Sequence, residues 1–261
     1  MTLFIHELKQ SKWSLIIWTV AIAYMLGIAI VIYPQMAPQM NEMGDMFANM
    51  GGFTAAFGMD QINFGEFWGY FAIECGNVLG LGGALFAALT GVSALSKEQK
   101  DNTAEFLLTH PISRRRIVAL KLAAVLTQTA VLTVAVMLAA CLATAVIGES
   151  IKLKELLLLF VAYLLMQAQI ACISFGISAF SRGRGIGAGL GMALMLYFVN
   201  ILSNLTDRLE ALKYLTPFAY ADGAYIVSNS VLQFEYIAAG AIFALFGITA
   251  AFIRYTTKDI T

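Results

Sequence analysis

The sequence predicts an all-α integral membrane protein with six transmembrane helices. Of its 261 residues 60% are hydrophobic and 12% are charged, with a mean hydropathy of +0.79. Soluble domains carry about 25% charged residues, so this composition excludes an ordinary soluble protein. Apolar runs also recur at lengths that cross the hydrocarbon core, which takes about 20 helical residues. The net charge is zero, and we expect no nucleic-acid partner because such a surface needs a basic excess.

The chain begins with a short amphipathic segment. Residues 2–13 place Leu3, Phe4 and Leu8 on one helical face, a pattern typical of a helix that lies along the membrane surface. We expect the first span at about 14–33. Pro34 should end it, because proline breaks the hydrogen bonding of a helix interior.

Residues 34–66 form an acidic loop without lysine or arginine. Its apolar side chains recur at alternating steps of four and three, namely Met36, Met40, Met43, Phe47 and Met50. This spacing predicts one face of a helix, packed on the bundle or at the lipid boundary. The alternative is a thioether site for a soft metal such as Cu(I). The loop has no histidine or cysteine to support that alternative.

The second span is expected at about 67–95. It holds Glu74 and Asn77 together with several glycines, and small residues let another helix approach closely. A carboxylate at membrane depth usually faces a cavity or a partner. Glu74 lies only about two turns from the outer end, so a position among the headgroups is the alternative.

The remaining spans are expected at about 117–147, 156–180, 185–203 and 234–253. Gln128, Gln167 and Gln169 lie within them and are candidates for hydrogen bonds between helices. The three cysteines, Cys75, Cys141 and Cys172, lie far apart in apolar runs, which favours buried thiols over a disulfide or metal site.

Two segments beside the fifth span need a separate interpretation. The alternating glycines from Gly185 to Gly191 suit tight helix packing. A phosphate-binding loop is excluded because no strand precedes them and no Gly-Lys-Ser/Thr follows. Residues 204–233 are polar and aromatic and contain Pro217. They predict broken, partly re-entrant helices, which are tolerated only when packed in protein.

The basic residues indicate the orientation. Twelve of the 16 lysines and arginines fall on one predicted side, namely Lys9, Lys12, Lys97, Lys100, Arg114, Arg115, Arg116, Lys121, Arg182, Arg184, Arg254 and Lys258. Because basic loops stay in the cytoplasm, we expect a multi-pass protein of the cell membrane with both termini cytoplasmic.

The stretch from Ser96 to Lys121 is the longest strongly charged interval in the chain. Asp101 or Asn102 can cap a short helix, and Glu105 would lie in its first turn, where the helix dipole favours a carboxylate. The helix should end near His110, because the residue before a proline avoids the helical region.

This short helix would hold an apolar face on a charged loop. Phe106, Leu107 and Ile112 would form that face, and Ser113 can cap the helix that follows. We interpret the segment as a docking element for a partner, with packing of Phe106 against its own spans as the alternative.

The same stretch resembles the conserved signature of ABC type-2 permeases. The matching residues are Glu98, Asn102, Thr103, Glu105, Phe106, Leu107, Leu108, Pro111, Ile112, Ser113, Arg114 and Lys121. These permeases are membrane subunits of ABC exporters with the six-span type V fold, and the likeness covers essentially the whole chain. Asn102 stands where glycine is commoner, a change that an N-cap role would tolerate.

The resemblance implies a mechanical role in a complex of two permeases and two ATPase subunits. Residues 101–109 would be the coupling helix in a groove of the ATPase, and Pro111 to Arg116 its exit. The implied coupling residues are Asp101, Glu105, Phe106, Leu107, Leu108, Pro111, Arg114 and Arg115. Cargo would pass along the interface between permeases, and the candidates for that path are Glu74, Asn77, Gln167 and Asn200.

The sequence has no Walker motif and no segment that predicts a nucleotide-binding domain. We therefore expect no enzyme activity, metal or cofactor in this chain, with ATP and Mg²⁺ bound by the partner ATPase. The second permease copy, or a homologous permease, and membrane lipid are the other expected partners. An ion-coupled secondary transporter and a membrane scaffold remain alternatives, while an intramembrane enzyme lacks any nucleophile–base spacing.

Overall fold

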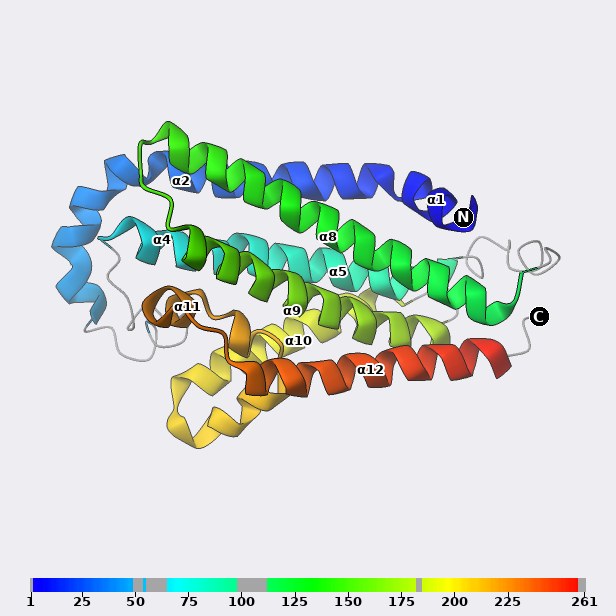
Figure 1. Ribbon diagram of the computed structural model, residues 1–261. Coiled ribbons are helices and arrows are strands. Elements are labelled where there is room, and N and C mark those ends of the chain that lie inside the picture. The colour runs from blue at the N-terminus through cyan, green and yellow to red at the C-terminus, as the bar shows by residue number, and fades with distance from the viewer. Residues whose placement is uncertain (1, 49–53, 55–64, 98–111, 182–184, 258–261) are drawn as a thin grey trace.

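The computed structural model describes residues 2–48, 54, 65–97, 112–181 and 185–257, without the side chains of 2, 41–48 and 207. This part of the chain is helical throughout (Figure 1), and six of its helical stretches are long and apolar enough to cross a membrane. They are α2 (Lys12–Ala48), α4 (Phe67–Glu74) continued by the π-helix η1 (Cys75–Gly80) and α5 (Leu81–Ser93), α8 (Arg114–Val146), α9 (Leu153–Phe180), α10 (Ile186–Leu205) and α12 (Phe234–Thr257). The expected all-helical fold with six spans is confirmed.

Helix α9 forms the centre of the bundle and packs most extensively against α5 and α12. The crossing with α12 is close because two glycines meet there. A Cβ atom on Gly176 would lie 2.8 Å from the Cα atom of Gly247. Small residues at such a crossing let two backbones approach, which is the main way helices gain contact in a membrane.

The N-terminal segment is helical, as predicted, but it also packs against the bundle. Helix α1 (Thr2–Gln10) ends before α2 begins at Lys12, and it contacts α8 as well as α2. Its Leu3 side chain packs on the core and its Glu7 side chain is buried. One side of α1 therefore faces protein.

The prediction that Pro34 ends the first helix is wrong. Helix α2 continues through Pro34 and Pro38 to Ala48, and its later, light-blue part turns across the end of the bundle (Figure 1). A proline inside a helix removes one hydrogen bond and bends the axis without having to stop the helix. Met36 and Met40 fall on this continued helix, with Met40 partly packed on the core. The side chains of Met43, Phe47 and Met50 lie outside the described residues.

The segment between α10 and α12 consists of short helices, as predicted. They are the 3₁₀ helices η2 (Asp207–Leu215) and η3 (Ala219–Ala221) and helix α11 (Gly223–Asn229). Asp222 caps α11, because its Oδ1 atom accepts hydrogen bonds from the backbone N–H groups of Ala224 and Tyr225 at 2.9 and 3.2 Å. Phe218 to Ala221 are buried, so this irregular backbone packs in protein.

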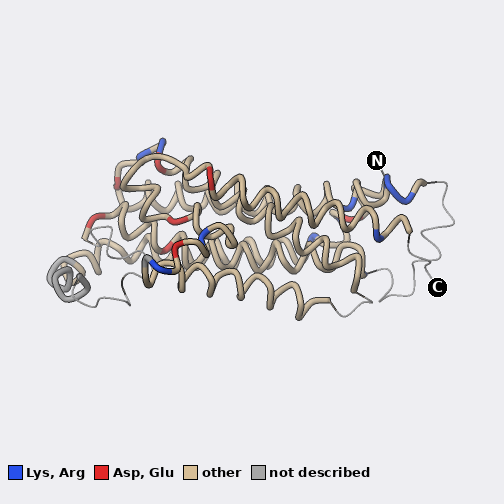
Figure 2. Tube along the Cα trace, turned by 90° about the horizontal axis from the view of Figure 1, so that it is seen from below, with Lys and Arg blue, Asp and Glu red and all other residues tan. Residues whose placement is uncertain are grey.

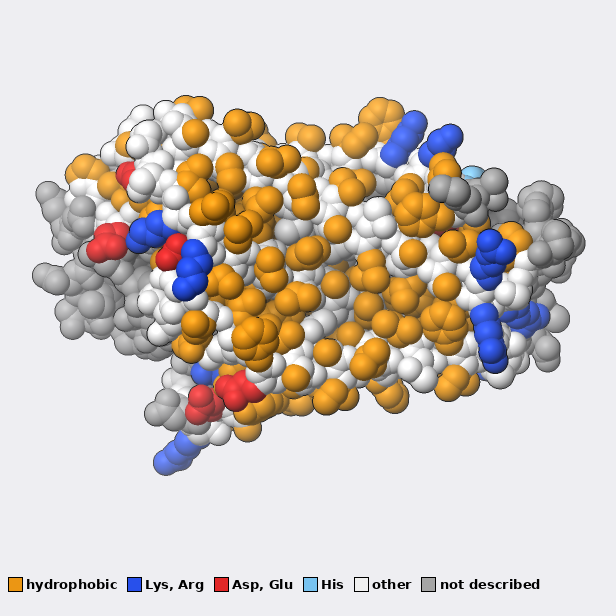
Figure 3. Space-filling view, in the orientation of Figure 1, with side chains coloured by type: hydrophobic (Ala, Val, Ile, Leu, Met, Phe, Trp, Pro, Cys, Tyr) orange, Lys and Arg blue, Asp and Glu red, His pale blue; other side chains and the backbone are white. Residues whose placement is uncertain are grey.

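Charged side chains gather at the two ends of the molecule. Figure 3 shows hydrophobic side chains over the middle of the visible face and charged ones toward its ends, and Figure 2 repeats this separation in a second view. The described chain starts and finishes at the same end (Figure 1), which we call the terminal end. The opposite end carries the α8–α9 connection and α11.

Candidate translocation and coupling site

Two of the four predicted path residues line the same cavity. Asn77 of η1 and Asn200 of α10 both face a cavity of about 70 Å³. Its other polar lining residues come from α9, α10 and the cap of α11, namely Tyr163, Tyr197, Asn204 and Asp222. We call it the outer cavity, because it lies in the half of the bundle away from the terminal end.

The π-helix shapes one wall of the outer cavity. Tyr163 lies against two glycines of η1, and a Cβ atom on Gly80 would be 3.3 Å from its ring. The corresponding distance from Gly76 to the Tyr163 hydroxyl oxygen is 3.5 Å. Glycine at these positions gives the aromatic ring room beside the widened helix. π-helical turns occur often at functional sites.

Two buried oxygen atoms near this cavity lack a partner. The Tyr163 hydroxyl oxygen and Asn200 Oδ1 accept and donate no hydrogen bond within the described chain. Leaving such a group unsatisfied costs about 1–3 kcal/mol, so the cavity favours a polar guest. A volume of 70 Å³ matches about two water molecules, and it is too small for a drug-sized cargo.

The other two predicted path residues lie elsewhere. Glu74 is half-buried at the end of α4 and does not line the outer cavity. Gln167 is buried inside the bundle, where it accepts a hydrogen bond from Thr133 Oγ1 at 2.9 Å and donates one to the Leu79 carbonyl of η1 at 3.4 Å. Gln167 therefore joins three spans, and its amide is engaged in the protein.

The expected interhelical hydrogen bonds form at Gln167 and also at Gln169. Gln169 Oε1 accepts from the Tyr220 hydroxyl at 2.8 Å, and its Nε2 donates to the Ile237 carbonyl at 3.1 Å. Burial raises the pKa of Tyr220, which keeps its hydroxyl a neutral donor. Gln128 differs, because its buried Oε1 atom has no partner in the described structure.

The coupling region is described only at its exit. Asp101, Glu105, Phe106, Leu107, Leu108 and Pro111 lie outside the described residues. Ser113 caps α8 by accepting a hydrogen bond from the Arg116 backbone N–H at 3.4 Å, as the sequence predicts. Arg114 Nη1 donates to the Thr256 carbonyl of α12 at 3.4 Å, while Arg115 is exposed. The exit of the loop is thus joined to the last span.

The terminal end holds a buried ion pair that is not predicted from the sequence. Lys121 Nζ lies 2.7 Å from Glu7 Oε1, and the two side chains are 0% and 10% exposed. In the sequence Lys121 serves as an orientation signal and as one residue of the family resemblance, and neither predicts a buried partner for it. A better clue is its spacing, because Lys121 recurs with the buried Val118 and Val125 on one face of α8. Glu7 similarly follows Leu3 by four residues.

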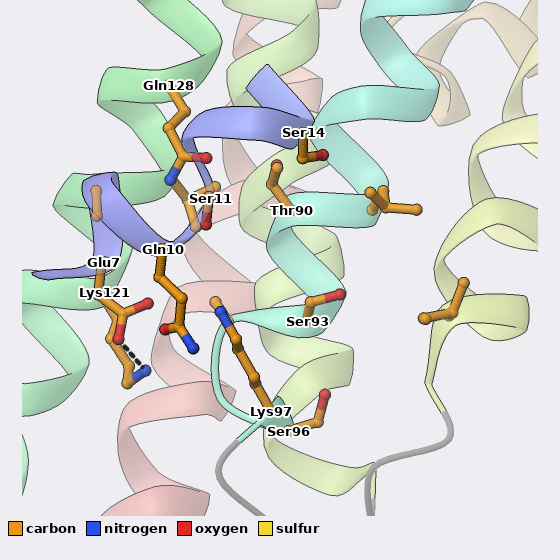
Figure 4. Close-up of a pocket in the computed structure, with 15 residues that line it drawn as sticks. Glu7, Gln10, Ser11, Ser14, Thr90, Ser93, Ser96, Lys97, Lys121 and Gln128 are labelled. Atoms are coloured by element: carbon orange, nitrogen blue, oxygen red, sulfur yellow. Dashed lines mark hydrogen bonds and ion pairs between the residues drawn. The ribbon is translucent and has the colours of Figure 1, made fainter. Parts of the chain in front are cut away.

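The ion pair lines a second and larger cavity of about 300 Å³ (Figure 4). We call it the inner cavity. Helix α1 and the start of α2 form one wall, and α5, α8 and the start of α10 form the others. Its polar lining residues are Glu7, Gln10, Ser11, Ser14, Thr90, Ser93, Ser96, Lys97, Lys121 and Gln128.

Six apolar spans around polar cavities define a multi-pass membrane protein. The family model described as ABC-2 family transporter protein matches residues 1–260. The chain therefore belongs to the ABC-2 transporter family, whose members are membrane permeases of ABC transporters. No curated protein matches the chain.

Proposed function

We propose that the protein is the permease subunit of an ABC exporter, which works as a dimer and is driven by a separate ATPase through residues 101–116. The observation that carries this proposal is the family match over residues 1–260. The capped start of α8 supports it, because Arg114 ties the end of the coupling loop to α12. A displacement of the loop by the ATPase would then be transmitted to both α8 and α12.

The terminal end is the cytoplasmic side in this proposal. Lys9, Lys97, Arg115 and Arg254 lie there, and the only described acidic side chain at that end is Glu7. Such an excess of basic residues is typical of cytoplasmic segments. Helix α5 ends and α8 begins at this same end, where a soluble ATPase would reach them.

Helix α10 supports the dimer. Its outer face is apolar and exposed, with Leu194, Met195, Phe198, Leu202 and Leu205. Gly187 and Gly191 lie on the same face, and a Cβ atom added to either would meet no atom within 4 Å. Glycines four residues apart suit close packing of two helices in a membrane. A second permease, identical or homologous, fits this face.

The outer cavity is the part of the path that the described residues support best. It lies between η1 and α10, so it borders the span that we assign to the dimer interface. Asn77 and Asn200 would offer hydrogen bonds to cargo there. In this proposal Gln167 connects three spans inside the bundle, and Glu74 does not line the cavity.

The chain would supply no catalytic group to ATP hydrolysis. Two copies of an ABC ATPase would hold ATP and Mg²⁺, and each would seat one coupling helix. Phe106 is the best anchor, since a large aromatic on a charged loop fits a pocket of the partner. Truncating such an anchor typically costs about 2 kcal/mol at a hot spot, roughly a thirty-fold loss of affinity.

The test is co-expression of the permease with an ABC ATPase, followed by complex retention and ATPase stimulation in one detergent. Phe106→Ala should weaken association or uncouple hydrolysis from transport, while membrane insertion stays intact. Glu105→Ala should act more mildly, within about 0.3–1 kcal/mol for a charge at a helix N-terminus. Trp13→Ala, an exposed aromatic off the loop, is the control and should change neither.

Three results would contradict the proposal. Full affinity and coupling in Phe106→Ala would remove the docking role of the loop. Transport by an ATPase-free monomer would favour the ion-coupled secondary transporter, and an ATPase that ignores every cargo would favour a scaffold.

A further inference from the structure

The inner cavity has a neutral polar end that the proposed function does not use. The whole cavity measures about 300 Å³, which falls at the lower end of small-molecule pockets. In Figure 4, Gln128, Ser11, Ser14 and Thr90 lie in the upper part of the view, and the charged side chains lie below them. Four neutral polar side chains are thus gathered at one end of a ligand-sized space.

The charged lining residues at the other end already have partners. Glu7 and Lys121 pair across 2.7 Å, and Lys97 takes part in an interaction of its own. Gln128 follows Lys121 by seven residues, which places it about 10 Å farther along α8. The neutral end is therefore separated from these charges, and it suits a guest without charge.

Gln128 is the lining residue that most clearly needs a ligand. Its side chain is buried, and its Oε1 atom has no hydrogen-bond partner within the described chain. An amide oxygen can only accept, and leaving it unsatisfied in a buried place is unfavourable. Thr90 Oγ1 donates to the Phe86 carbonyl at 2.9 Å, so its lone pairs are left to accept. Both groups therefore require an O–H or N–H donor from a guest.

Serines on two walls of the cavity add groups that can both donate and accept. Ser11 and Ser14 stand at the start of α2, and Ser93 stands on α5 beside Thr90. Ser14 follows Ser11 by three residues, and Ser93 follows Thr90 by three. The polar groups of each wall are therefore about 4.5 Å apart along the helix. A six-membered ring with hydroxyl groups around its edge has similar dimensions, and each hydroxyl can donate to one wall and accept from another.

We propose that the inner cavity binds a neutral cyclic polyol of the size of one hexose. A ring hydroxyl donates to Gln128 Oε1, and others meet Ser14 and Thr90 on the facing walls. Leu89 and Val125, which also line the cavity, contact the C–H groups of the ring. A free sugar and the sugar headgroup of a glycolipid share this chemistry, so the experiment compares the two. The assignment rests on the cavity alone and does not depend on transport or on the ATPase.

Binding is measured on the purified full-length protein in tetraethylene glycol monooctyl ether, a detergent without sugar. Native mass spectrometry compares glucosyl dioleoylglycerol with dioleoylglycerol and dioleoylphosphatidylglycerol, and calorimetry follows a titration with free glucose. The glucosyl lipid, free glucose or both should bind roughly tenfold more tightly than the two lipids without a sugar, as loss of a hydrogen bond predicts. Binding of the glucosyl lipid alone assigns the site to a headgroup, and binding of free glucose assigns it to a soluble sugar.

Variants of the lining residues locate the bound sugar. Gln128→Leu should weaken binding roughly tenfold, and Ser14→Ala should weaken it roughly threefold. Gln128→Leu should fold, because an apolar group of similar size removes the unsatisfied oxygen. Thr127→Val is the matched control and should leave binding unchanged. Thr127 neighbours Gln128 on α8, but its hydroxyl donates to the Ala123 carbonyl at 2.8 Å and it does not line the cavity.

The same measurements can overturn the proposal. Equal binding of dioleoylglycerol shows that the sugar has no role, and equal binding of dioleoylphosphatidylglycerol shows that the site does not select a neutral ring. Unchanged binding by Gln128→Leu and Ser14→Ala places the sugar elsewhere on the protein. If Gln128→Leu does not fold, Ser14→Ala decides alone. Binding of neither glucose nor its lipid shows that the cavity holds only water.

Discussion

The second span and α10 are both rich in glycine, yet their glycines have different surroundings. In α5 a Cβ atom on Gly91 would lie 2.5 Å from the Ala171 carbonyl oxygen of α9, and one on Gly83 would overlap the Gln167 amide. In α10, Gly189 packs against Val92 of α5, whereas Gly187 and Gly191 face open space. One glycine pattern is therefore used inside the chain, and the other leaves a face for a second molecule. Spacing alone does not separate packing within a subunit from packing between subunits.

The ion pairs show the same contrast between interior and exterior. Glu7 and Lys121 meet at 2.7 Å and are nearly inaccessible to solvent. Glu210 and Lys213 of η2 lie 3.5 Å apart, with side chains 61% and 28% exposed. Removing one member of a buried pair leaves the other charge buried without a partner. The charge that remains from an exposed pair is solvated by water. Substitutions at these pairs and glycines test the contrast directly.

The largest effect is expected at the buried pair. Lys121→Met should lower the free energy of unfolding by about 3–5 kcal/mol, because Glu7 stays buried without its partner. Lys213→Met should cost less than about 1 kcal/mol, since exposed pairs contribute little. Equilibrium unfolding in mixed detergent micelles measures both. Adding Glu7→Leu should recover most of the loss at Lys121, and equal costs for the two lysine variants would contradict the contrast.

A smaller loss is expected where α5 crosses α9. Gly91→Leu should destabilise the monomer by about 1–3 kcal/mol or more, because overpacking forces helices apart and the obstacle is the α9 backbone. Gly187→Leu is the matched variant on α10 and should change monomer stability by less than about 0.5 kcal/mol. Thermal unfolding of both proteins in one detergent gives the comparison. A similar loss in both would show that the open space beside α10 is filled within the monomer.

Substitution of both exposed glycines of α10 should affect the fold least, but it should clearly reduce dimer formation. Gly187→Leu combined with Gly191→Leu should leave the monomer folded but reduce the dimer fraction, because the two helices can no longer approach closely. Cysteine cross-linking at Met195, an exposed residue of α10, reports the dimer in membranes. An unchanged yield of cross-linked dimer would place the interface on another helix, and α2 is as little buried as α10.

Local patterns predict the six spans, because hydrocarbon thickness sets the length of an apolar helix. The Ser113 cap is also local, and it forms as expected. The wrong prediction that the first helix ends at Pro34 also has a local cause, because proline can either bend a helix or end it. The pattern of residues on each side does not decide between those outcomes.

Contacts between distant segments are harder to read from the sequence. Asn77 and Asn200 are predicted as path residues one at a time, and their shared cavity follows only from the packing of η1 beside α10. The partner of Lys121 lies 114 residues away, so no spacing rule connects the two. Tyr163 is missed because an aromatic residue in an apolar span carries no polar signal until its hydroxyl is placed in a cavity.

The separation of Glu7 from Lys121 also bears on how the protein is made. Glu7 leaves the ribosome 114 residues before Lys121, which at 5–20 residues per second amounts to roughly 6–23 s. During that interval the Glu7 carboxylate lacks Lys121, its partner in the folded protein, and an unpaired charge is costly in the hydrocarbon. Helix α1 must therefore wait at the membrane surface while α2 and the second span insert. The arrival of α8 draws it into place, so the first helix synthesised docks only after the third span has been made.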